Sequence, residues 1–532
     1  MNTDTDDLAV LITCKHEAIL LLKWLKKSRA RTVCTSVNAY LLLQAEGFGE
    51  TSELIDAPLP GGRAVELVAQ AEYLARALDA DIARYIGEVV GAPVSQGWDY
   101  WDKLLFATSL LPVAEWLRMH DLSGLPERVA VCCFASPQDY FHPSAIRTQL
   151  YAEALRRAGK RVVKIPIEYP LGPPHTPGVW QTTYRVSLPA RHLKGARLVH
   201  VPSAFYAQEA LVAMYGVEGF LGLDSPFYEN HILLRKVDLD RGDVANRPSL
   251  IDMAEPLRLY QAFAEALGFA NIDGMPQQLA HWRERLAFQF RAFKMLSLLR
   301  DRYGVGLAAI SDHDGGLFGP LCSAFREQVE PVRVFPHSTI SVGPLPDLAS
   351  EVIGFMEPLR PLRPFDRATL PVPNLQRGIP RPCSADAAIA IVLNEIDDVS
   401  GLPVHSLRAL LDFLAALVAG LLVKGLRPLL RARPSTPIRA FCDFDIETWD
   451  GDLGELISES AVYVGVGQVT TAVCRFWGAG VVCLHVQEGD LSLQDGYTLP
   501  ADGVECFVGR PFMESLPEVL ACIEGHFAEG GV

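Results

Sequence analysis

Titratable side chains gather where several apolar, strand-like runs of the sequence end. The densest group follows the run VGLAAIS (305–311) and consists of Asp312, His313 and Asp314, with two glycines next in the chain. Carboxylates this close shift one another's pKa values, which is what a general base working near neutral pH requires. These three residues are therefore candidates for acid–base catalysis. The letters D-x-D-G are also those of an ordinary turn or a cation-binding loop.

Polar residues follow two other apolar runs. His16 comes shortly after LAVLIT (8–13), where a histidine can accept the proton of a hydroxyl near neutral pH. A partly exposed histidine at a helix start is the alternative. Asp139 and His142 follow RVAVCCF (128–134) and are candidates for the acceptor side of a site. The Ser-Pro and His-Pro pairs beside them also suit a plain turn.

A strand, a loop and a helix are predicted between residues 461 and 480. VYVGV reads as a buried strand, Gly465 and Gly467 allow a tight turn at its carboxyl end, and Thr470 or Thr471 can cap the next helix. Free backbone N–H groups and the helix dipole then face the loop, which is the environment that a phosphate prefers. The pattern predicts an anion site, or else only a well-formed turn from strand to helix.

This segment resembles the donor-binding part of GT-B glycosyltransferases. In that family a Gly/Ser/Thr loop leads into a helix that begins near the phosphates of the nucleotide, and a strand of the G-x-P-V type follows. Here the loop is 465–471, the helix is TTAVCRFWGAG, and VVCLHV stands in the place of the strand. The chain departs from the family pattern at Gln468 and at Ala479-Gly480-Val481.

Two shorter motifs resemble members of the same superfamily. The letters H-D-G resemble the motif that holds the base in bacterial sialyltransferases, with Asp314 as the matching residue, although the companion His-Pro motif is not evident. His337 and Ser338 follow the strand-like run VRVF and resemble the His-Gly or His-Ser turn of GT-B enzymes that build polysaccharides.

The resemblance implies that a nucleotide sugar lies against the C-terminal domain, while N-terminal loops supply the acceptor groups and the base. The implied reaction transfers a sugar to a hydroxyl acceptor, inverting and metal-independent, with Asp314 or His16 as base and no cofactor beside the nucleotide sugar. A glycan, a lipid-linked sugar or a protein fits as acceptor, in surface polysaccharide biosynthesis or protein glycosylation. The donor-binding candidates are His337, Ser338, Asn394, Gly465, Gly467, Gln468, Thr470, Thr471 and Glu488.

The elements that must position these residues alternate between apolar strands and helices, which implies parallel sheets covered by helices on both faces. Seven prolines between 358 and 382 stiffen an extended connector. We expect an α/β fold of two Rossmann-like domains facing a cleft, like GT-B. The N-terminal domain with insertions covers 1–357, the linker 358–383, and the C-terminal domain 384–532, ending in a closing helix.

Composition narrows the classes of partner. The 532 residues, 49% of them hydrophobic, suffice for about three domains of ~150 residues or for two large ones. A net charge of −15 disfavours capture of nucleic acid. The longest uncharged apolar run, FLAALVAGLLV, is too short to cross a bilayer and reads as a core helix. No signal peptide is visible, so a cytoplasmic location is expected, and peripheral membrane association is compatible with it.

Metal sites are not predicted. The 11 cysteines lack the spacing of metal ligands and read as reduced, buried thiols. The resemblance is to the GT-B class and not to the metal-dependent GT-A class, so a required Mg²⁺ is not expected.

Two other classes fit the same residues. A sugar-nucleotide epimerase or phosphorylase can use the same double-Rossmann scaffold, because a fold does not fix the chemistry. Hydrolysis or epimerisation of a sugar-nucleotide donor in the absence of an acceptor would indicate this class. A non-catalytic partner subunit, consistent with the atypical Gln468, would bind a nucleotide sugar without turnover.

Overall fold

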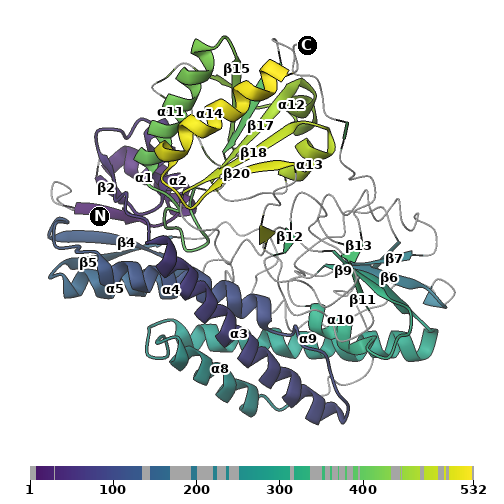
Figure 1. Ribbon diagram of the computed structural model, residues 1–532. Coiled ribbons are helices and arrows are strands. Elements are labelled where there is room, and N and C mark those ends of the chain that lie inside the picture. The colour runs from purple at the N-terminus through teal and green to yellow at the C-terminus, as the bar shows by residue number, and fades with distance from the viewer. Residues whose placement is uncertain are drawn as a thin grey trace.

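The computed structural model describes most of the chain outside several loops. Described are residues 8–28, 30–134, 144–167, 193–200, 220–224, 235–238, 251–311, 317–335, 350–353, 360–361, 369–370, 378–379, 387–393, 396–432, 436, 442, 444, 446–467, 472–488, 497–498 and 503–529. In this part of the chain the strands form three larger sheets and one two-stranded ribbon (Figure 1).

The first sheet is parallel throughout. Its strands are β1 (Leu8–Ile12), β2 (Arg31–Cys34), β3 (Ser52–Leu54), β4 (Arg128–Phe134) and β5 (Arg161–Ile167), in the order β3-β2-β1-β4-β5. Helices α1 (Lys15–Ser28), α2 (Val37–Ala45) and α5 (Ser144–Arg157) connect them. Every residue of β1 is buried, which explains why its sequence LAVLI is apolar throughout and does not alternate.

The second sheet is also parallel and lies farther along the chain. Its strands are β6 (Arg197–His200), β7 (Phe220–Asp224), β8 (Arg235–Asp238), β9 (Gly306–Ser311), β10 (Val332–Phe335), β11 (Ser350–Ile353) and β13 (Thr369–Leu370). Their order is β13-β11-β10-β9-β6-β7-β8. The short helix α10 (Phe318–Ala324) connects β9 to β10.

The third sheet is formed by the C-terminal part of the chain. Its parallel strands are β14 (Ala388–Leu393), β15 (Arg427–Ala432), β16 (Glu447–Thr448), β17 (Ser460–Val466), β18 (Val482–Gln487) and β20 (Val504–Val508), in the order β16-β15-β14-β17-β18-β20. Helices α11 (Leu407–Val423), α12 (Leu453–Glu459), α13 (Ala472–Gly478) and α14 (Phe512–Glu529) accompany it. The ribbon pairs β12 (Arg360–Pro361) with β19 (Tyr497–Thr498) in antiparallel fashion.

All three sheets share one strand order. When the described strands of each sheet are counted along the chain, the order begins 3-2-1-4-5, which is the Rossmann order. The direction of winding reverses between the first and fourth strands, namely at β1/β4, β6/β9 and β14/β17. Ligands of open parallel sheets bind beyond the carboxyl ends of the strands at this switch point. The expected α/β class with Rossmann-like parallel sheets is confirmed.

Two sheets begin before residue 358, where we expected one Rossmann-like unit, and the last strand of the second sheet, β13, falls within 358–383. Four helices form a layer beside them. Helices α3 (Gly61–Val90) and α4 (Tyr100–Met119) come between β3 and β4 along the chain, and α8 (Ala254–Ala266) and α9 (Met275–Tyr303) come between β8 and β9. Helix α4 packs on α5 beside the first sheet, and α9 packs on α10 beside the second, so the layer joins the two sheets (Figure 1). The division of the chain at 358–383 stays a prediction.

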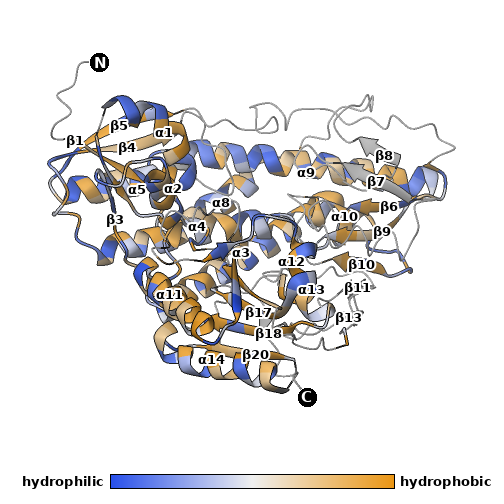
Figure 2. Cartoon of the chain, turned by 90° about the horizontal axis from the view of Figure 1, so that it is seen from above, coloured by the Kyte–Doolittle hydropathy of each residue, from blue (hydrophilic) through white to orange (hydrophobic). Residues whose placement is uncertain are grey.

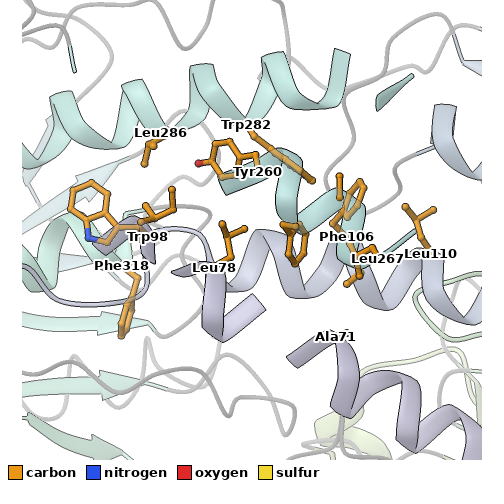
Figure 3. Close-up of a cluster of buried hydrophobic side chains, with 14 of the residues drawn as sticks. Ala71, Leu78, Trp98, Phe106, Leu110, Tyr260, Leu267, Trp282, Leu286 and Phe318 are labelled. Atoms are coloured by element: carbon orange, nitrogen blue, oxygen red, sulfur yellow. The ribbon is translucent and has the colours of Figure 1, made fainter. Parts of the chain in front are cut away.

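Aromatic side chains and a buried charge network fill the helical layer (Figure 3). The rings of Phe106 and Trp282 meet edge to face with their centroids 4.8 Å apart. Beside them the Lys103 amine is fully buried and donates to Asp99 (2.9 Å) and Asp102 (2.7 Å). It also lies 4.5 Å from the centroid of the Trp282 ring. Because a buried charge is tolerated only when it is paired, these contacts fix the arrangement of the helices.

Helix α11 contains the apolar run FLAALVAGLLV, and Figure 2 shows the helix apolar along most of its length. Its buried residues, among them Leu410, Leu414 and Leu417, pack in the core of the third sheet. The expected core helix is thus confirmed. Among the described residues, no helix is long and apolar enough to span a membrane.

Candidate functional site

The predicted site positions follow strands that the structure contains. Asp314 follows β9 and His337 follows β10 in the second sheet, and Asn394 follows β14 at the switch point of the third sheet. Four of the candidates, His16, Gly465, Gly467 and Glu488, are described. The others lie outside the described residues and stay predictions: Asp139, His142, Asp312, His313, Asp314, His337, Ser338, Asn394, Gln468, Thr470 and Thr471.

Gly467 forms the turn that we expected after β17. Its φ of +88° lies in the left-handed region that favours glycine. Its N–H donates to the carbonyl of Val486 (3.0 Å), which continues the ladder between β17 and β18 by one residue. Helix α13 then begins at Ala472 and spans seven residues, fewer than the 11 letters of TTAVCRFWGAG. The loop from Gly467 to α13 therefore follows the strand that flanks the switch point.

Gly465 has a different role from the one we expected. It lies inside β17 and not in the turn. A Cβ built at this position would lie 2.6 Å from Tyr463 Oη and 3.0 Å from the ring of the same residue. The glycine thus leaves room for the phenol of Tyr463 to extend along the strand toward its carboxyl end. Tyr463 is buried and packs on Phe476 with ring centroids 4.6 Å apart.

Reading the sequence drew attention to Gln487 and Glu488 after VVCLHV, but it missed the neighbouring His485. Gly465 is the register partner of His485, and His485 Nε2 lies 3.3 Å from Gln487 Oε1. Both side chains are buried, and burial lowers the pKa of His485 to about 4, so its ring is neutral at physiological pH. The signal was two polar residues, two positions apart, at the end of the apolar run VVCLHVQ.

Glu488 stands directly after β18, next to this polar pair. Its side chain is partly buried, and burial raises the pKa of its carboxyl group above the usual value. Gly467, His485, Gln487 and Glu488 together belong to the carboxyl ends of β17 and β18. Of these groups, the Glu488 carboxylate is only partly buried, whereas His485 and Gln487 are buried and contact each other.

The carboxyl end of β1 in the first sheet is filled by the chain itself. The Glu17 carboxylate accepts the backbone N–H of Thr13 (2.5 Å) and the Thr13 hydroxyl (3.0 Å). Burial raises the pKa of Glu17, and the positive charge of Arg147 opposes this shift. His16, the candidate base, is exposed on the first turn of α1, as in the alternative reading of an exposed helix-start histidine.

A cavity of about 220 Å³ lies at the other end of the third sheet. Val482 at the start of β18 and Gly503 just before β20 line it, so it opens at the amino ends of the strands, away from Gly467. Gly480 borders it with a φ of +77°, and a Cβ built there would lie 2.0 Å from the carbonyl oxygen of Ile379. This close approach explains the glycine in Ala479-Gly480-Val481, where the chain departs from the GT-B pattern.

Among the residues that the structure describes, no group of three or more His, Cys, Asp or Glu side chains could hold a metal ion.

Comparisons with known proteins give likenesses to solved structures alone. No family model matches the chain, and no curated protein matches its sequence. Among solved structures, the chain is similar to one described as "Crystal Structure Analysis of the Glycotransferase of kitacinnamycin", at 11% sequence identity and a TM-score of 0.21. The alignment covers 98% of this chain and 95% of that one. A likeness as loose as this does not establish a shared activity.

Proposed function

We propose that this chain is a glycosyltransferase that moves a sugar from a nucleotide-sugar donor to a hydroxyl acceptor. The carboxyl edge of the third sheet carries this proposal. Its strand order is the Rossmann order, and the glycine turn at Gly467 follows the strand that flanks the switch point. A nucleotide fits such an edge, because its phosphates bind backbone N–H groups there. The step from nucleotide binding to glycosyl transfer rests on the resemblance to GT-B enzymes.

The donor would lie across the ends of β14, β17 and β18, which are neighbours in the sheet. Backbone N–H groups of the loop from Gly467 to Thr471 would bind its phosphates, with the hydroxyls of Thr470 and Thr471. Asn394 and Glu488 would bind hydroxyls of the nucleotide or of the sugar. Gln468, His337 and Ser338 complete the proposed donor site.

The acceptor would be activated from the second sheet. We assign the base to Asp314, which follows the central strand β9, in preference to the exposed His16. Its carboxylate takes the proton of the acceptor hydroxyl while the hydroxyl oxygen forms a bond to the anomeric carbon. The bond from that carbon to the nucleotide phosphate breaks, and the phosphate leaves with the electron pair. Direct displacement inverts the anomeric centre and needs no metal or cofactor in this proposal.

The first experiment is a thermal-shift screen of the full chain against UDP, GDP, CMP and dTDP sugars. One class of nucleotide should raise the melting temperature, because a ligand that binds only the folded state stabilises it. Stabilisation by none of the four would contradict the donor site.

Two variants separate donor binding from catalysis. Thr470→Ala combined with Thr471→Ala should weaken nucleotide binding in calorimetry, whereas Ser458→Ala, an exposed hydroxyl at the amino edge of the same sheet, should not. Asp314→Asn should bind the donor normally and lose transfer. Transfer at the wild-type rate would remove Asp314 as the base.

A further inference from the structure

The first and third sheets are joined by two reciprocal helix caps. The Asp397 carboxylate belongs to the third unit, by which we mean the third sheet with its helices. It accepts the Ser36 hydroxyl (2.6 Å) and the backbone N–H groups of Val37 (2.8 Å) and Asn38 (3.0 Å) at the start of α2. In the opposite sense, the Asp56 carboxylate accepts the Ser406 hydroxyl (2.8 Å) and the backbone N–H groups of Leu407 (2.8 Å) and Arg408 (3.2 Å) at the start of α11. Each helix therefore begins on a carboxylate that the other unit supplies.

The segment from Ile396 to Ser406 is fastened to the first sheet between these caps as well. Gly401 has a φ of +81°, and a Cβ built there would lie 2.5 Å from the carbonyl oxygen of Thr13, at the end of β1. The buried Arg147 guanidinium donates to the carbonyl of Ser400 (3.4 Å). The segment consequently covers the carboxyl ends of the first sheet, beside β1.

The first sheet offers little room for a ligand at this place. In a nucleotide-binding Rossmann unit, a phosphate occupies the turn after the first strand. Here the Glu17 carboxylate already accepts the N–H and hydroxyl of Thr13 in that turn. The segment from Ile396 to Ser406 packs over the same turn at Gly401. The first sheet thus serves as a platform on which the third unit docks.

The docked segment starts at the proposed donor site. Strand β14 ends at Leu393, and Asp397 follows only four residues later. The positions between them include Asn394, the candidate donor-binding residue beside the switch point. Three hydrogen bonds fix Asp397 to the start of α2, and each residue of chain spans at most about 3.6 Å, so the end of β14 at Leu393 lies within four such lengths of that fixed point.

We propose that Asp397 is a positioning residue of the donor site. Its carboxylate, bound to the start of α2, holds the chain that leaves β14 at the sheet edge where the nucleotide is proposed to bind. The proposal rests on the proposed function for its ligand, and on the hydrogen bonds of Asp397 for its mechanism. It assigns the first sheet a role in donor binding without any contact to the donor.

The test compares two matched variants, Asp397→Ala and Asp56→Ala. Each removes a carboxylate that accepts one serine hydroxyl and two backbone N–H groups at a helix start, so each should lower the melting temperature by a similar amount. Only Asp397 is joined to the end of β14. Affinity is measured by calorimetry with whichever of UDP, GDP, CMP and dTDP binds the wild type most tightly.

We expect the Kd to rise about tenfold or more in Asp397→Ala and to stay within about twofold of wild type in Asp56→Ala, since small misplacements of a site cost large factors. Ser36→Ala, which removes one partner of Asp397 from the other side, should raise the Kd in the same direction but less. Asp397→Asn, which keeps the shape, should fall between wild type and Asp397→Ala. Equal Kd values in Asp397→Ala and Asp56→Ala would overturn the proposal.

Hydrogen exchange of the free protein gives a second readout that needs no ligand. Amides of residues 393–396 should exchange faster in Asp397→Ala than in Asp56→Ala, because only the first variant releases this segment. Unchanged exchange there would also overturn the positioning role. If no nucleotide binds the wild type, the proposed function fails, and the exchange data alone decide whether Asp397 holds the end of β14.

Discussion

Replacing Gly465 by alanine tests why a glycine stands inside β17. The new Cβ would lie 2.6 Å from Tyr463 Oη and 3.0 Å from its ring, both far inside van der Waals contact. Tyr463 cannot move away freely, because it is buried and packs on Phe476. Overpacking of this kind typically costs about 1–3 kcal/mol, so Gly465→Ala should lower the free energy of unfolding by about that amount.

Tyr463→Phe in the same chain provides the decisive comparison. It removes the atom nearest to the new Cβ, while the ring contacts at 3.0 Å remain. The double variant should therefore recover part of the loss, with a coupling energy of about 1 kcal/mol between the two positions. The single variant Tyr463→Phe supplies the cost of losing the hydroxyl itself.

Urea unfolding of the wild type, the two single variants and the double variant gives the free energies of this double-mutant cycle. Hydrogen exchange of amides in β17 and β18 assigns the changes to the third sheet. Strictly additive effects of the two substitutions would refute the packing explanation. In that case, a large loss of nucleotide affinity in Gly465→Ala would return the glycine to a direct role beside the phosphates, as the sequence first suggested.

Three further outcomes follow from the described contacts. Lys103→Met should destabilise the helical layer by about 3–5 kcal/mol in urea unfolding, because it removes the cation that pairs with the buried Asp99, while Asp102 keeps Arg285 (2.7 Å). A loss below about 1 kcal/mol would speak against a structural role for this network. Burial lowers the pKa of His485 to about 4, below the value of about 6.5 in an unfolded chain. The stability that the neutral buried ring contributes is therefore present above pH 6.5 and is lost as the pH falls toward 4. Wild type should therefore lose more stability than His485→Gln between pH 7 and pH 5, and parallel pH profiles would exclude a buried neutral ring. Gly401→Ala should speed hydrogen exchange at Thr13 and in α2, since the added Cβ would lie 2.5 Å from the carbonyl oxygen of Thr13. Unchanged exchange would contradict the close packing of Gly401 on the end of β1.

Part of the candidate site was predictable because its signals are local. The turn at Gly467 was read from two glycines after an apolar run, and its positive φ confirms the turn. The end of β9 was also predicted from the sequence, since the strand ends at Ser311, directly before the predicted cluster of titratable residues.

Other features needed the assembled fold. His485 read as part of a buried strand, and only the register of β17 and β18 places it beside Gly465. Gly465 itself was taken for a turn residue, because a sequence does not show that the neighbouring tyrosine extends along the strand. The number of sheets before residue 358 was equally out of reach, since successive strands of one alternating pattern can join the same sheet or different ones.

By itself, the sequence determined the secondary structure and the α/β class, because apolar periodicity, glycine turns and caps act over a few residues. The tertiary structure alone decided which polar groups meet. Asp397 and Ser36 are separated by 361 positions, and Asp56 and Ser406 by 350, yet each pair forms a cap between units. A carboxylate in a loop looks solvated in any sequence. Its partner is a helix start brought to it by packing of the sheets, and packing depends on the whole core and not on neighbouring letters.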